Sequence, residues 1–184
     1  MYFQKASDAD LQGILDLQRK NFVHNLTDNE KKQGFLSIEF TKDQFKTMND
    51  ETGIIVCKNS GTIYGYLCTS SLKFNRSFEL PCTMMNLYPQ LHYKGKALDK
   101  YCSVVAGPWC IEKNLRGKNI FINMWAALGL VLGKNIDLIT TFVSIHNLRS
   151  YYAAQKVGME EIATFKVNSN EFFLLAKTHV HGEI

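Results

Sequence analysis

A short basic loop between an expected strand and an expected helix carries the clearest chemical signal in this chain. The loop covers residues 112–119 and contains Arg116, Gly117 and Lys118. The first turn of a helix leaves backbone N–H groups without an intrahelical acceptor, and the helix dipole adds partial positive charge there. Glycine allows a ligand to approach the backbone closely, and the two cations add charge. The loop therefore predicts a phosphate site, with a solvated turn as the alternative.

Two common nucleotide-binding patterns are missing from this loop. It lacks G-x-x-x-x-G-K-[ST], which excludes the usual loop for nucleoside triphosphates. It also lacks G-x-G-x-x-G, so we do not expect a dinucleotide-binding fold.

The cysteines and histidines do not suggest a metal site. No two cysteines are spaced as C-x-x-C, and no histidine lies near them at zinc-ligand spacing. His179 and His181 near the C-terminus are too few for such a site. We expect free thiols that are mostly buried, and no bound metal. The five cysteines are Cys57, Cys68, Cys82, Cys102 and Cys110.

The elements that must position the loop can be placed from apolar periodicity and turn residues. Strands are expected at residues 2–6, 53–58, 63–72, 101–111, 136–144, 160–167 and 171–177, and helices from Ser7, at 29–34, from Thr41, at 119–132 and at 148–157. A hairpin in the first half and alternating strands and helices in the second half predict one domain over residues 1–184. Its fold class is mixed α/β, with helices on both faces of the sheet.

Two stretches depart from regular patterns. Residues 73–100 contain Pro81 and Pro89 without clear periodicity, and we expect an irregular insertion that either covers a pocket or packs on the core. Gly107-Pro108 interrupts the strand at 101–111, which should bulge or splay there because proline cannot donate to the ladder.

Two motifs in the second half resemble the GNAT superfamily of N-acetyltransferases. Arg116 begins a degenerate match to the coenzyme A loop R/Q-x-x-G-x-G/A, in which Asn119 and Phe121 replace the two small residues. Asn tolerates positive φ better than other non-glycine residues. The second motif is a strand, then Asn147, a helix with the small residue Ser150, and a closing element. Lys156, Gly158 and Met159 form that closing element in register.

The resemblance implies a GNAT-like fold, namely a mixed and mostly antiparallel central sheet with a splayed strand pair. The pair would be 101–111 and 136–144, with the pantetheine arm of acetyl-CoA in the gap. A backbone N–H near Trp109–Ile111 would stabilise the thioester oxyanion as an amine attacks directly. The resemblance implies these acetyl-CoA-binding residues: Cys110, Ile111, Arg116, Gly117, Lys118, Asn119, Ile120, Phe121 and Asn147.

The catalytic assignments follow from the same resemblance. Many members place a tyrosine four residues before the closing glycine as the acid, and this chain has Ala154 there. Tyr151 lies one turn earlier on the same helix face and could substitute, with a packing role as the alternative. Glu112 follows the key strand and is the candidate base, with His146 as a second candidate. For both residues a structural role remains an alternative. Cys110 has no activating partner in the sequence.

The composition is that of an ordinary globular protein, with 46% hydrophobic and 21% charged residues, a net charge of +4 and a pI near 8.7. The charges are mixed along the chain, so we expect no nucleic-acid groove. No signal peptide or membrane span is expected, which favours a cytoplasmic protein. The resemblance implies a small-molecule or protein amine as the acceptor, and the oligomeric state is open, a homodimer included. A non-catalytic acyl-CoA-binding regulator is the main alternative, and a nucleic-acid-associated protein is a third.

Overall fold

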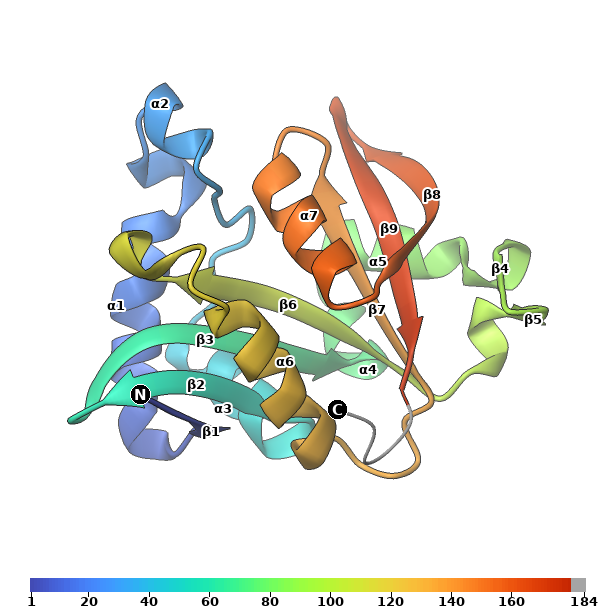
Figure 1. The fold of residues 1–184 in the computed structure, drawn as a ribbon. Coiled ribbons are helices and arrows are strands. Elements are labelled where there is room, and N and C mark those ends of the chain that lie inside the picture. The colour runs from blue at the N-terminus through green and yellow to red at the C-terminus, as the bar shows by residue number, and fades with distance from the viewer. Residues whose placement is uncertain (180–184) are drawn as a thin grey trace.

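The computed structural model describes residues 1–179. Seven strands form one sheet in the order β1-β2-β3-β6-β7-β9-β8 (Figure 1). The two short strands β4 and β5, of two residues each, form a separate hairpin. Every neighbouring pair in the sheet is antiparallel except β6 with β7. The strands are β1 (Tyr2–Lys5), β2 (Ile54–Asn59), β3 (Thr62–Ser71), β4 (His92–Tyr93), β5 (Lys96–Ala97), β6 (Ser103–Ile111), β7 (Leu138–Ser144), β8 (Glu160–Val167) and β9 (Asn170–Thr178).

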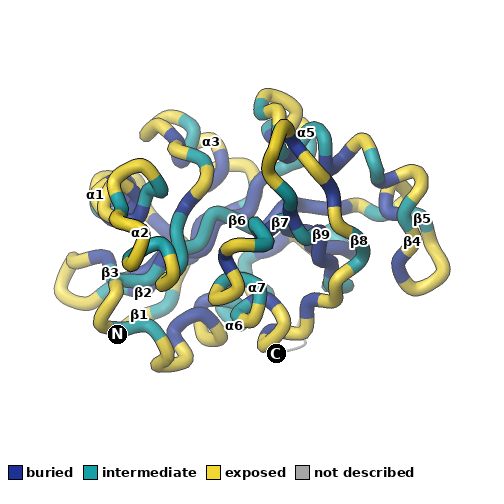
Figure 2. Tube along the Cα trace, turned by 90° about the horizontal axis from the view of Figure 1, so that it is seen from above, coloured by how far each residue is buried: buried dark blue, intermediate teal, exposed yellow. Residues whose placement is uncertain are grey.

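Helices cover both faces of this sheet, as the sequence predicts. The α-helices are α1 (Leu11–Asn21), α2 (Asp28–Lys31), α3 (Lys42–Glu51), α4 (Leu72–Asn75), α5 (Glu79–Asn86), α6 (Ile120–Val131) and α7 (Leu148–Lys156). The 3-10 turns are Asp8–Asp10, Val23–Asn25, Tyr88–Gln90, Leu98–Lys100 and Lys113–Leu115. Figure 2 shows buried segments along the strands and exposed segments on the outer turns and loops.

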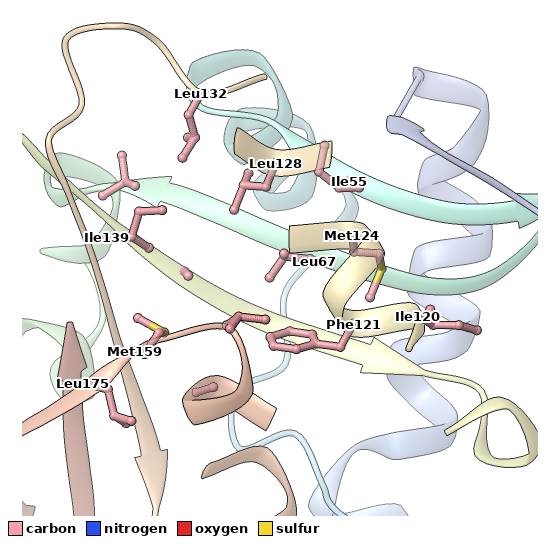
Figure 3. Close-up of a cluster of buried hydrophobic side chains, with 14 of the residues drawn as sticks. Ile55, Leu67, Ile120, Phe121, Met124, Leu128, Leu132, Ile139, Met159 and Leu175 are labelled. Carbon is pink, nitrogen blue, oxygen red and sulfur yellow. The ribbon is translucent and has the colours of Figure 1, made fainter. Parts of the chain in front are cut away.

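Three apolar clusters join the layers. The first lies between the sheet and α6 with α7, and includes Phe121, Met124 and Leu128 from α6 (Figure 3). The second lies between α1, α3 and the β2–β3 half of the opposite face. The third is formed by the 84–98 region against β7, β8 and β9. Burial of this apolar surface is the main force that fixes the layers.

The region at 73–100 is more regular than the sequence suggests. It contains α4, α5 and the β4–β5 hairpin, and most of it packs on the core: Met84 is fully buried, and the Tyr88 hydroxyl lies 2.7 Å from Thr140 Oγ1. Asn75 of α4 also lines a cavity that is described below. Pro81 does not prevent α5 because it is the third residue of that helix, where its missing N–H has no intrahelical acceptor to lose.

Strand β6 bulges and separates from β7, as expected from Gly107-Pro108. Two residues of β6 stand opposite one residue of β3 at this point, because Leu67 pairs with Trp109 whereas Thr69 pairs with Ala106. The parallel pairing with β7 covers only Ser103–Val105. Beyond it the two strands diverge, which is visible in Figure 1.

Candidate functional site

The gap between β6 and β7 is bordered by unpaired backbone of β6. Glu112 N–H donates to Tyr64 O across the β3–β6 ladder at 2.8 Å. Bonded and non-bonded pairs alternate along an antiparallel ladder. Cys110, two residues before Glu112, therefore directs its backbone groups to β3, whereas those of Trp109 and Ile111 face the gap. The Ile111 carbonyl agrees with this, since it accepts from a loop side chain at 2.9 Å.

The loop after β6 has the backbone geometry of a phosphate site. Gly117 has φ +82°, and a Cβ at this position would meet no heavy atom within 4 Å. Asn119 adopts the left-handed conformation with φ 60°, as expected for an Asn in place of a glycine. Asn123 N–H is the first in α6 to bond within the helix, to Asn119 O, so the N–H groups of residues 120–122 precede the ladder. The site therefore has both room and donors for an anion.

A cavity of about 350 Å³ extends from this helix start to α7. Its walls come from β6, the loop, α6, the outer side of α7 and the segment 33–36. Arg149 and Lys156 bring positive charge from α7. A pyrophosphate needs such a combination of backbone donors and cations, so the residues present fit coenzyme A. Lys118 is exposed between two lining residues, Gly117 and Asn119.

Phe121 forms part of the wall of this cavity. Its ring lies 5.1 Å from that of Trp109 and 6.0 Å from that of Trp125, measured between ring centroids. Figure 3 shows it reaching from α6 across β6. The bulky residue is therefore packed into the core and narrows the space that a small residue would leave open.

Arg116 is used within the protein. Its guanidinium donates to Ile111 O at 2.9 Å, to Gln33 O at 2.5 Å and to Asn21 Oδ1 at 2.5 Å. Partial burial lowers the pKa of this guanidinium, although not enough to remove its charge. Arg149 donates to the Gln33 side chain at 2.7 Å. The two arginines thus hold segment 33–36 against the loop and α7.

A second, smaller cavity of about 80 Å³ lies on the other side of the gap. Both β6 and β7 line it, together with residues 35–38 and 40. The two cavities share four wall residues, which are Phe35, Leu36, Trp109 and Ser150. A group held in one cavity can therefore meet a group held in the other at the point where the strands separate.

The two tyrosines on α7 lie in different surroundings. The Tyr151 hydroxyl donates to Glu161 Oε2 at 2.7 Å, and its ring packs on Phe173 at 4.4 Å. The hydrogen bond to Glu161 raises the pKa of Tyr151, which makes it a weaker acid. Tyr152 is 55% exposed and lines the larger cavity. The spacing between Tyr151 and the fully buried Ala154 predicted the helix face of Tyr151 but not the direction of its hydroxyl.

The candidate bases lie away from the meeting point. Glu112 caps the 3-10 turn at Lys113–Leu115 and lies 3.9 Å from Lys20, and it is not among the described residues that line either cavity. His146 is likewise outside both linings over residues 1–179. Neither geometry supports a role as base.

Asn147 and Cys110 are held by the protein itself. Asn147 caps α7 through Ser150 N–H, and its amide donates to Phe35 O at 3.0 Å, so it borders the smaller cavity. Cys110 lines the larger cavity, and burial raises the pKa of its thiol to about 12. A thiol with this pKa is not a nucleophile at neutral pH.

Several site residues were missed by the sequence analysis. Segment 33–36 had no chemical motif, and its place depends on contacts with residues more than eighty positions away. Arg149 and Ser150 lie inside the recognised Asn147 motif, so their adjacency to Asn147 was the available signal.

The described part of the chain offers neither a cluster of metal ligands nor a membrane-spanning helix. Residues 1–179 contain no group of three or more His, Cys, Asp or Glu side chains arranged to hold a metal ion. His181 lies outside the described residues. Within the same range no helix combines the length and apolar character needed to cross a bilayer.

Comparison with known proteins identifies the fold. No family model and no curated protein matches the chain. Among solved structures, the ribosomal-protein-alanine N-acetyltransferase from Brucella melitensis is 16% identical with a TM-score of 0.63, over 97% of this chain and 99% of that one. An N-acetyltransferase from Staphylococcus aureus Mu50 is 14% identical with a TM-score of 0.63, over 96% and 97%.

A third similar structure contains the acyl donor. The GNAT superfamily phosphinothricin acetyltransferase from Sinorhizobium meliloti, solved in complex with acetyl-CoA, is 14% identical with a TM-score of 0.61, over 98% of this chain and 89% of that one. The chain therefore has the fold of the GNAT acetyltransferases, which confirms the sequence resemblance at the level of the fold.

Proposed function

We propose that this chain, which has the GNAT fold, transfers an acetyl group from acetyl-CoA to an amine. The observation that carries the proposal is the pair of cavities that meet where β6 leaves β7. The larger cavity ends at a helix start suited to phosphate, and the smaller one is open to a second reactant. Two substrates could then be held together without a covalent intermediate on the protein.

The larger cavity would hold acetyl-CoA. Backbone N–H groups at residues 120–122 would bind the pyrophosphate, and Arg149 and Lys156 would add charge. The gap-facing backbone of Trp109 and Ile111 is placed to pair with the pantetheine arm. Acetyl-CoA supplies an activated thioester, and the fold supplies its position.

The smaller cavity would hold the amine that attacks the thioester carbon. Negative charge then develops on the carbonyl oxygen, and a gap-facing N–H of Trp109 or Ile111 is suited to stabilise it. Ser150 lines both cavities and carries a hydroxyl, which can accept one hydrogen bond while donating another. Ser150 would therefore donate to the departing sulfur in place of a tyrosine.

The role of Ser150 has its own test. Ser150→Ala is expected to lower kcat roughly tenfold, since general acid–base assistance contributes about a hundredfold or more and a water can replace part of it. Stabilisation by acetyl-CoA should stay the same. An unchanged kcat would remove Ser150 from the mechanism.

A non-catalytic acyl-CoA-binding protein is the second candidate. It is favoured by the buried Ala154 and by the Tyr151 hydroxyl on Glu161, which together leave the usual tyrosine position without a phenol. Binding of acetyl-CoA without turnover of amines would support it.

Both candidate functions require that the protein binds acetyl-CoA, and thermal unfolding with acetyl-CoA, coenzyme A and ATP tests this. A ligand at about 100 times its dissociation constant adds roughly 2.7 kcal/mol, which raises the midpoint by about 5–10 °C for a domain of this size. Acetyl-CoA and coenzyme A should stabilise the protein and ATP should not. Release of free thiol on addition of amine then separates the enzyme from the binding protein.

A further inference from the structure

The walls of the smaller cavity, as residues 1–179 form them, carry no charged side chain and contain many apolar residues. Leu36, Ile38 and Phe40 line it from the segment before α3. Trp109 lines it from β6, and Phe142 and Val143 line it from β7. None of the described residues that line this cavity is Asp, Glu, Lys, Arg or His. No carboxylate in the wall could pair with an ammonium group, and no cation could pair with a carboxylate.

The polar side chains in this wall bond mainly to the protein. Thr141 Oγ1 donates to Ala106 O at 2.8 Å across the separating strands. Asn147 donates to Phe35 O at 3.0 Å. The Asn75 amide donates to a serine hydroxyl and to a backbone carbonyl, both at 2.8 Å. These contacts hold the wall together and leave it few polar groups for an acceptor.

A charged group that enters this cavity loses part of its hydration and finds no side chain of opposite charge in the described part of the wall, so a neutral group is expected to bind better. Size adds a second restriction. A cavity of about 150 Å³ is enough for benzene, whereas this cavity is about 80 Å³. A short alkyl chain fits it better than an aromatic ring.

We propose that the acceptor is a primary amine with a short, uncharged alkyl chain, and that it binds as the neutral amine. This inference rests on the proposed function. The amine nitrogen forms the C–N bond and the C–S bond breaks. The proton lost by nitrogen is taken up by sulfur, so the products are the amide and the free thiol of coenzyme A. The proton of the dissolved ammonium ion is released to solvent before binding.

Three amines of equal chain length test the proposal: butylamine, 4-aminobutanoate and 1,4-diaminobutane. They differ at the far end, which is methyl, carboxylate or ammonium. With acetyl-CoA and thiol detection, kcat/KM for butylamine should exceed the other two by at least tenfold. The ammonium form of butylamine has a pKa near that of lysine, about 10.4. Because only the neutral amine binds, kcat/KM for butylamine should rise about tenfold per pH unit between pH 7 and 9.

A charge placed in the wall should change this preference. Ser37 lines the cavity and is exposed, so Ser37→Asp adds a carboxylate with little risk to folding. This variant should raise kcat/KM for 1,4-diaminobutane relative to butylamine by tenfold or more. Ser169→Asp, in the exposed turn between β8 and β9, is the matched control and should keep the wild-type ranking.

The outcomes separate the two proposals. If acetyl-CoA fails to stabilise the protein, the proposed function and this inference both fall. If acetyl-CoA stabilises it but butylamine is not acetylated, or a charged amine reacts as well, this inference alone is overturned. An unchanged ranking in Ser37→Asp would also overturn it, because the smaller cavity would then not be the acceptor site.

Discussion

Replacement of Arg116 by lysine is expected to destabilise the protein before any ligand is added. The guanidinium joins Ile111 O, Gln33 O and Asn21 Oδ1, at 2.9, 2.5 and 2.5 Å. Lysine lacks the planar fork and can keep about one of these bonds. The acceptor on Asn21 is buried, whereas Gln33 is exposed and water can replace its bond. Loss of two charge-assisted bonds, at about 1.5–3 kcal/mol each before partial replacement by water, gives an expected loss of roughly 2–4 kcal/mol.

The assay is urea denaturation together with thermal unfolding of the ligand-free protein. About 1 kcal/mol shifts the midpoint of a domain of this size by roughly 2–4 °C, so Arg116→Lys should melt roughly 5–15 °C lower. Arg149→Lys is the matched control, because Arg149 makes one hydrogen bond, to the exposed Gln33 side chain at 2.7 Å. That exposed contact contributes less than about 1 kcal/mol. Equal midpoints for the two variants would refute the structural role of Arg116 and return it to the phosphate-binding residues.

Three further predictions follow from the geometry. Gly117→Val should abolish stabilisation by acetyl-CoA, because the φ of +82° disfavours a side chain and a valine would enter the cavity wall; an unchanged shift would exclude this loop as the site. Burial alone would raise the pKa of Asp10, but hydrogen bonds from Lys58 and from Ser7 lower it below its ordinary value. Its stabilising contribution is therefore complete above the unfolded pKa, about 3.9, and is lost as pH falls through the lower folded value. Urea denaturation of Asp10→Asn should show a flatter loss of stability below about pH 4, and parallel curves would contradict this. Cys110 should resist iodoacetamide at pH 8 while the exposed Cys102 reacts, as peptide mass spectrometry can show; rapid labelling of Cys110 in the folded protein would contradict its burial.

The parts of the fold that the sequence predicted correctly depend on local signals. The order of strands and helices along the second half of the chain follows from alternating patterns, and the bulge in β6 follows from the proline within it. The left-handed Asn119 follows from the conformational preference of a single residue type. Each of these features is set by residues within a few positions of one another, which is the range over which a sequence pattern is informative.

The features that were missed depend on contacts between distant segments. Tyr151 and Tyr152 are neighbours on α7. Spacing could not decide which of them lines the cavity, because the direction of the Tyr151 hydroxyl depends on where Glu161 of β8 lies. Helix α5 contains a proline, and its sequence shows no clear helical periodicity, so the sequence did not predict it. Its position is fixed by burial against β7, β8 and β9. Segment 33–36 is held by arginines from two later elements.

The two halves of the site differ in the same way, and this explains why the acyl donor could be predicted and the acceptor could not. In the proposed acetyl-CoA half, the backbone donors for phosphate and the gap-facing backbone of β6 come from the continuous stretch 109–122. That part of its chemistry can therefore be predicted from consecutive residues. The proposed acceptor half is lined from four separate parts of the chain, by residues 35–38 and 40, by residue 75, by residues 105–109, and by residues 141–144, 147 and 150. Its decisive property is the lack of a charged side chain in the wall over the described residues. Such a property belongs to no segment by itself and becomes apparent only after the segments have assembled.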